Sequence, residues 1–172
     1  MNGLRGRAAE AGLRVLAAAG WPGPADAEPP RLAGFVHSNF NPIVAAVAGR
    51  CLAELPESAP PDGDDAGTAL VLVSDLGDVE SAAHVARAVD TGARVGPLFF
   101  FQSVPNAVLG HVAARHALTG PVACVCDAAS GLDVARGLLA DGDAGRVLLI
   151  ELDHDETGET AAAVLVADGG AS

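Results

Sequence analysis

Most apolar residues of this chain gather in short continuous runs, and the stretches between the runs have the spacing of helices. A strand that is buried on both faces gives a continuous apolar run, whereas a half-buried strand alternates. The runs predict five strands, over 31–39, 68–75, 121–126, 145–153 and 160–168. Only a short acidic turn separates the last two, so we expect them to pair as a hairpin. The segment 95–105 is expected to be extended.

Capping residues predict the helices between these strands. Asn41 suits an N-cap and Pro42 a first helical position for a helix over 41–55. Asp78 and Gly92 suit the start and the end of a helix over 76–92. Further helices are expected over 5–19, 106–120 and 128–140, and 56–67 is expected to be a surface loop.

Strands that alternate with helices imply a mostly parallel sheet with right-handed crossovers. We therefore expect an α/β fold with a mixed, mostly parallel five-stranded sheet and helices on both faces. Pro residues in 21–30 predict a linker. The expected division is an N-terminal helix and Pro-rich linker over 1–30, followed by one domain over 31–172.

The acidic composition restricts the partners of the chain. All ten basic residues are Arg, and the formal net charge is −12. Such a charge argues against binding to nucleic acid or to an anionic membrane. It would also repel an acidic carrier protein unless a local Arg patch compensates. The three Cys residues match neither a disulfide framework nor a metal signature, so we expect a cytoplasmic protein with reduced thiols, no metal and no cofactor.

Several segments share their order and spacing with one known family. They are SNFNPIVAAVAGRCLAEL, LVSDLGDVESAAHVARAV, PLFFFQSVPNAVLGHVAARHALTGP, CDAASGLDVARGLLADGDAGRVLLIELD and TAAAVLVAD. Together they resemble the N-terminal half of a β-ketoacyl synthase of the thiolase-like superfamily, over about 31–168. The resemblance implies a thiolase-like half-domain from a polyketide or fatty-acid-type pathway.

The chain departs from this family where the nucleophile belongs. Condensing members carry Thr-Ala-Cys-x-Ser-Gly at the turn before a helix, and aligning Ser130-Gly131 with that Ser-Gly places Ala128 at the Cys. A methyl group cannot form a thioester. The family takes its two catalytic His residues from its C-terminal half, which the matched segments do not include. We therefore expect no catalytic residue, with Cys126 as the weak alternative thiol.

The resemblance also implies contact residues. The strand 121–126 is the expected pairing edge, because synthase dimers join their sheets through the strand before the nucleophile. Core packing is the simpler interpretation of Cys124 and Cys126, and also of the Phe cluster at 99–101. The candidate contacts with an acyl chain or a partner are Phe99, Phe100, Phe101, Gln102, Val122, Cys124, Cys126 and Leu132.

The remaining titratable residues favour structural roles. His111 and His116 lie five residues apart on one predicted helix and are poor joint metal ligands. The acidic stretch 151–159 reads as a solvated turn. The predicted helix over 128–140 has few polar residues beyond Asp133 and Arg136, so we expect a partner to cover it.

These observations favour a non-catalytic β-ketoacyl-synthase-like protein, similar in logic to a chain length factor. It would form a homodimer or a heteromer with a ketosynthase-type subunit, with an acyl carrier protein as a further partner. Two alternatives stay open. One is a truncated acyltransferase or synthase half that completes its site with a partner's residues, and the other is a binding module for an acyl chain.

Overall fold

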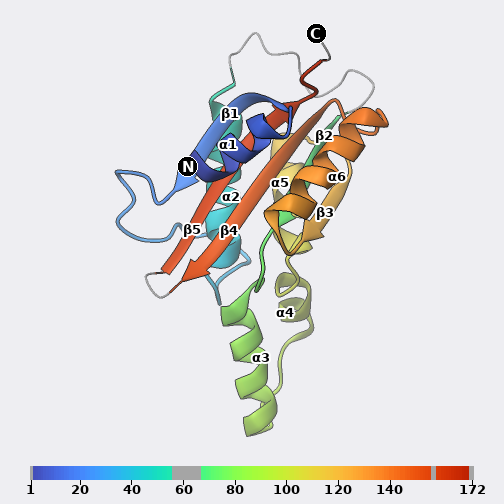
Figure 1. Cartoon of the computed structure of the whole chain (residues 1–172). Coiled ribbons are helices and arrows are strands. Elements are labelled where there is room, and N and C mark those ends of the chain that lie inside the picture. The colour runs from blue at the N-terminus through green and yellow to red at the C-terminus, as the bar shows by residue number, and fades with distance from the viewer. Residues whose placement is uncertain (1, 56–66, 156–157, 171–172) are drawn as a thin grey trace.

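The computed structural model describes residues 2–55, 67–155 and 158–170. Its five strands form one mixed sheet in the order β1-β5-β4-β2-β3 (Figure 1). The strands β2 (Thr68–Val73), β3 (Val122–Val125) and β4 (Arg146–Asp155) are parallel, with β2 in the middle. The strand β5 (Gly158–Ala167) runs antiparallel to β4 and to β1 (Arg14–Trp21). The expected mixed sheet and hairpin are confirmed.

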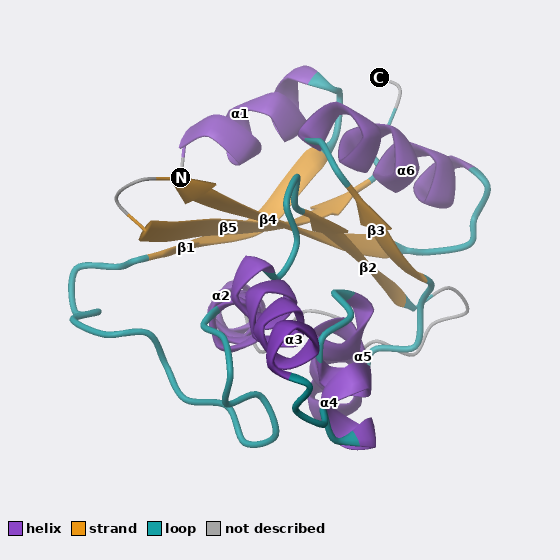
Figure 2. Ribbon diagram, turned by 90° about the horizontal axis from the view of Figure 1, so that it is seen from below, coloured by secondary structure: helices purple, strands orange, loops and turns teal. Residues whose placement is uncertain are grey.

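Helices cover both faces of this sheet (Figure 2). One face carries α1 (Asn2–Glu10) and α6 (Ala128–Ala140). The other face carries α2 (Phe40–Ala53) and α5 (Asn106–His116). The helix α3 (Val79–Thr91) projects beyond the end of the sheet, and the short α4 (Pro97–Gln102) lies between it and α5 (Figure 1).

The continuous apolar runs have the expected cause. Every residue of β2 is buried, and so are the residues of β4 from Val147 to Ile150. Side chains that alternate along these strands enter two separate cores, one under α2 and α5 and one under α1 and α6. A strand whose two faces both meet helices is almost wholly apolar, and Thr68 is the one polar residue of β2.

Two predictions about the N-terminal part were wrong. The helix expected over 5–19 ends at Glu10, and residues 14–21 instead form β1, which pairs with β5 from Arg14 to Trp21. These residues form the edge strand of the sheet. Their alanines have a high helix propensity, which is why the sequence pattern predicted a helix. The segment 31–39 contains only an isolated bridge between Leu32 and Phe35 and is no strand. The expected loop 56–67 lies almost wholly outside the described residues.

A buried polar network explains why Asn41 lies inside α2 and does not cap it. Its Nδ2 donates to Oδ2 of Asp78 at 3.0 Å. The same carboxylate accepts the backbone N–H of Ser81 at 2.9 Å, so Asp78 caps α3 as predicted, and it accepts the Ser81 hydroxyl at 2.7 Å. Asn39 occupies the N-cap position of α2. The network joins α2 to the start of α3.

The end of α5 offers a test of the helix geometry. Ala117 adopts the left-handed conformation with φ 52°, which favours Gly. We expect Ala117→Gly to raise the free energy of unfolding by about 0.5–1 kcal/mol, measured by denaturant titration. The control Ala114→Gly, at an exposed position within α5, should lower it by a similar amount. Loss of stability in both variants would contradict the assigned helix end.

Candidate functional site

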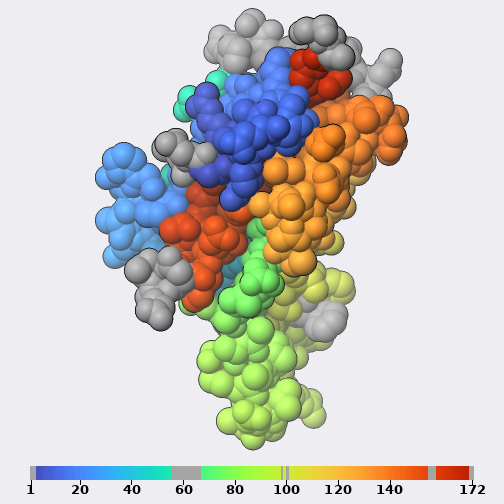
Figure 3. All heavy atoms as spheres, in the orientation of Figure 1, coloured from blue at the N-terminus to red at the C-terminus, as the bar shows by residue number. Residues whose placement is uncertain are grey.

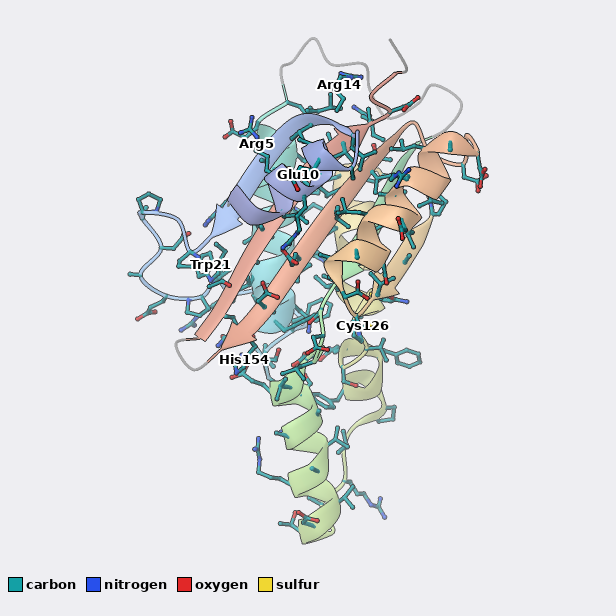
Figure 4. All side chains as sticks on the ribbon, viewed as in Figure 1. Arg5, Glu10, Arg14, Trp21, Cys126 and His154 are labelled. Carbon is teal, nitrogen blue, oxygen red and sulfur yellow. The ribbon has the colours of Figure 1, made fainter. Side chains whose placement is uncertain are left out.

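The turn between β3 and α6 lies at the carboxyl end of the parallel strands, where α/β proteins commonly place their sites. The strand β3 ends at Val125. Cys126 and Asp127 form the turn, and Ala128 is the first residue of α6. Cys126 is labelled at this end of α6 in Figure 4. The methyl group of Ala128 therefore stands at the start of the helix, where the helix dipole would stabilise negative charge.

Hydrogen bonds within the turn involve both oxygens of Asp127. Oδ1 accepts the backbone N–H of Ser130 at 2.9 Å, and Oδ2 accepts the Ser130 hydroxyl at 2.7 Å. These two bonds hold the pKa of Asp127 below its usual range, and the bond from the backbone N–H of Ser130 has the larger effect. Asp127 is therefore the N-cap of α6, and the Ser130 hydroxyl stabilises the turn.

Close packing explains the glycine that follows. A Cβ on Gly131 would lie 2.6 Å from Cγ2 of Val73 and 3.2 Å from Cδ1 of Leu149. The helix α6 therefore rests directly on β2 and β4. The Ser-Gly pair is needed to form this turn and to seat the helix, whether or not a nucleophile precedes it.

The two cysteines near the turn are exposed, so the expectation that they pack in the core was wrong. Within the described residues, β3 pairs only with β2 and is the last strand at this edge of the sheet. Although Cys124 is exposed overall, partial burial raises the pKa of its thiol to about 11. The polar contact of Cys126 is with Oδ2 of Asp127, at 3.7 Å.

Exposed apolar side chains occupy β3 and the segment before α5. Val122 of β3 is 43% exposed, Phe101 of α4 is 70% exposed, and Val104 is 42% exposed. Figure 2 shows β3 at the sheet edge between α6 on one face and α5 on the other. A free strand edge next to apolar side chains is a surface for association. No pattern in the sequence indicates an exposed Val104, because its exposure depends on how the chain turns after α4.

The other candidate contact residues lie elsewhere. The segment 95–105 contains the helix α4 and is not extended. Phe99 is buried there against the rings of His37 and His84, at centroid distances of 4.9 and 4.8 Å. Gln102 is half-buried, and the side chain of Phe100 lies outside the described residues. Leu132 is buried on the side of α6 that faces the sheet.

The outer side of α6 is less apolar than its sequence suggests. Leu132 and Ala135 pack on the sheet, and Leu138 and Leu139 are half-buried. The exposed positions hold small or charged residues, which are Ala129, Asp133, Arg136, Gly137 and Ala140. Figure 3 shows α1 and α6 side by side on this face. The edge of β3 is therefore a better candidate for a partner surface than the outer side of α6.

The acidic stretch 151–159 is mostly strand, so the predicted solvated turn was wrong. It forms the end of β4 and the start of β5, with 156–157 outside the described residues. Glu151 pairs with Arg7 of α1. Burial, and then Glu80, raise the pKa of Glu159.

In the described ranges, no group of three or more His, Cys, Asp or Glu side chains could hold a metal ion. None of the described helices is long and apolar enough to cross a membrane.

Comparisons with known proteins identify the fold. No protein-family model matches the chain, and no curated protein matches it significantly by sequence. Among solved structures, a ketosynthase in complex with its chain length factor from Xenorhabdus doucetiae matches with a TM-score of 0.71 and 15% identity, over 93% of this chain and 80% of that chain. The ishigamide ketosynthase/chain length factor matches with a TM-score of 0.67 and 22% identity, over 88% of this chain and 49% of that chain.

A third solved structure holds a type II polyketide synthase acyl-carrier protein in complex with its ketosynthase. It matches with a TM-score of 0.64 and 11% identity, over 91% of this chain and 62% of that chain. These likenesses show that the chain has the thiolase-like fold of ketosynthases and chain length factors. The chain spans about half the length of the second matched chain, as expected for a half-domain.

The pH dependence of stability tests the cap of α6. Because the folded pKa of Asp127 is lowered, the stabilisation it gives is present above the unfolded pKa of about 4 and is lost as the pH falls through the folded pKa. We expect Asp127→Ala to lower the melting temperature at pH 7 and to differ less from the wild type at pH 3. The control Asp133→Ala, exposed on the same helix, should change little at either pH. A difference for Asp127→Ala that persists at pH 3 would contradict the assigned cap.

Proposed function

We propose that the chain is a non-catalytic β-ketoacyl-synthase-like subunit of a polyketide or fatty-acid-type pathway. It acts in the cytoplasm by associating with a ketosynthase-type subunit. The observation that carries the proposal is the turn before α6, which keeps its cap at Asp127 and its close packing at Gly131 but presents only the methyl of Ala128. Such a turn supports packing and cannot support covalent acyl transfer at that position.

The free edge of β3 supports the association. An unpaired edge strand exposes backbone donors and acceptors that another strand can satisfy. Val122 supplies exposed apolar area on the strand itself. The first two structural matches come from assemblies of a ketosynthase with a chain length factor, and the first matched chain is not much longer than this one. A ketosynthase-type subunit is therefore the partner we favour, with a second copy of the chain as the alternative.

A carrier protein is the further partner that we propose. The third match contains an acyl-carrier protein bound to its ketosynthase, so an assembly of this fold can receive one. The net charge of −12 opposes direct docking of an acidic carrier on this chain. The carrier would therefore dock mainly on the ketosynthase-type partner.

The acyltransferase alternative depends on Cys126, because its thiol is exposed. Its polar contact is the Asp127 carboxylate, whose lowered pKa makes it a poor general base. The geometry therefore favours the non-catalytic role.

Association can be tested by co-expression with a candidate ketosynthase-type subunit, followed by size exclusion with light scattering. We expect a stable heteromer, and we expect Val122→Lys to weaken it by at least about tenfold, because a charge would be buried at the strand edge. Val36→Lys is the matched control, since Val36 is 76% exposed in a loop away from β3. A chain that stays monomeric with and without that subunit would rule out the proposal, and a homodimer alone would favour the second copy.

The catalytic alternative can be tested by intact mass after incubation with an acyl thioester. We expect no added acyl mass on the wild type. Cys126→Ala and Cys124→Ala serve as a matched pair, because both thiols are exposed on or beside β3. An adduct that disappears only in Cys126→Ala would overturn the non-catalytic assignment in favour of acyl transfer.

A further inference from the structure

A groove on the α2 and α5 face gathers much of the positive charge of this acidic chain. It has a volume of about 450 Å³ and lies between the segment around Arg31, α2 and α5. Five basic residues line it, and they are Arg31, Arg50, His111, Arg115 and His116. The lining contains no Asp or Glu. The groove lies on the opposite face of the sheet from α6 (Figure 2).

Arg50 is already neutralised and shapes one wall of the groove. Its two terminal nitrogens bond to both carboxylate oxygens of Asp26, at 2.5 and 2.6 Å. It also donates to the carbonyl of Gly20 at 3.3 Å and lies 5.2 Å from the ring centroid of Trp21. A guanidinium with this many contacts holds the loop before α2 in place and is not free to bind a ligand.

Arg31 and Arg115 are not neutralised in this way. Both are exposed, and within the described residues neither takes part in an ion pair. His116 packs against α2, where a Cβ on Gly49 would lie 3.7 Å from Nε2 of the ring. Burial lowers the pKa of His116, and Arg115 and His111 lower it further. The lowered pKa favours the neutral ring of His116, so the positive charge of the groove comes from Arg31 and Arg115.

The helix dipole alone does not explain this cluster. Cations near the carboxyl end of α5 are favourable, which accounts for Arg115 and His116. It does not account for Arg31, which comes from a different segment and faces the same groove. Convergence of unpaired cations from separate elements is typical of an anion site.

A second, more apolar groove continues from the first. It has a volume of about 440 Å³ and shares Pro30, Arg31, Leu32 and Pro42 with the cationic groove. Phe35 and Val36 add apolar surface to it, and Glu28 is its one acidic residue. A ligand that spans both grooves would meet cations at one end and apolar side chains at the other.

We infer that the two grooves together bind a phosphate monoester on an apolar chain, with the phosphate between Arg31, Arg115 and the two histidines. A phosphate monoester carries a charge of about −1.5 to −2 at pH 7, which the guanidinium groups of Arg31 and Arg115 can stabilise, with the ring N–H groups of the two histidines as further donors. The volumes are those of small-ligand sites and are too small for a protein helix. The site is separate from the edge of β3, so its failure would leave the association proposal intact.

The inference can be tested with n-octyl phosphate, kept below its micellar concentration, in a calorimetric titration of the full chain. We expect it to bind at least about tenfold more tightly than inorganic phosphate, because burying two methylenes already gives about that factor. Octyl glucoside, which has the same chain and no charge, should bind more weakly than octyl phosphate. Octyl phosphate should also shift the ring signals of His111 and His116 in NMR spectra.

Two variants locate the site. Arg115→Gln should weaken octyl phosphate binding by about tenfold, through loss of a charge-assisted hydrogen bond. Arg87→Gln removes the same charge from the exposed surface of α3 and should have no effect. Circular dichroism checks that both variants are folded. Equal affinities for octyl phosphate and inorganic phosphate, equal affinity for octyl glucoside, or equal effects of the two variants would overturn the inference. So would carrier-protein binding that depends on Arg115 when octyl phosphate binding does not.

Discussion

The rest of the structure depends on burying β2 and β4 on both faces. Each of these strands alternates side chains into two separate cores, so helices must cover both sides of the sheet. This requirement fixes α1 and α6 on one face and α2 and α5 on the other. Gly131 then sets how closely α6 approaches, because any larger residue would collide with Val73 and Leu149. The turn before α6 is therefore part of the core packing before it is a site.

The two edges of the sheet are formed by different kinds of strand pairing. Beyond β4, the hairpin strand β5 and then β1 extend the sheet with antiparallel pairs, so that edge lies far from the turn before α6. On the other side β3 is the last strand and leads directly into that turn. A partner strand added to β3 would bring a second protein against Val122 and Cys124, close to the start of α6. The edge of β3 and the turn that leads to Ala128 are therefore neighbouring parts of the molecule.

Charge is distributed against the overall balance of the chain. Acidic residues surround the carboxyl ends of the parallel strands, where Asp78 and Glu159 lie in buried or half-buried positions. Unpaired cations gather instead in the groove between α2 and α5. The charge in this groove is therefore opposite in sign to that at the ends of the strands, although the net charge of the chain is −12.

The sequence by itself determined the strands whose signal is strong and local. Continuous apolar runs predicted β2, β4 and β5, and the capping residue Asp78 predicted the start of α3. The resemblance around Ser130-Gly131 located the turn and the missing thiol at Ala128. The tertiary structure alone decided which strands lie at an edge. Cys124 and Cys126 look like core residues because an apolar run reads the same at an edge as in the centre, and Ala-rich β1 reads as a helix until β5 pairs with it. The Arg and His groove was equally hidden, because its residues are far apart in sequence and only packing brings them together.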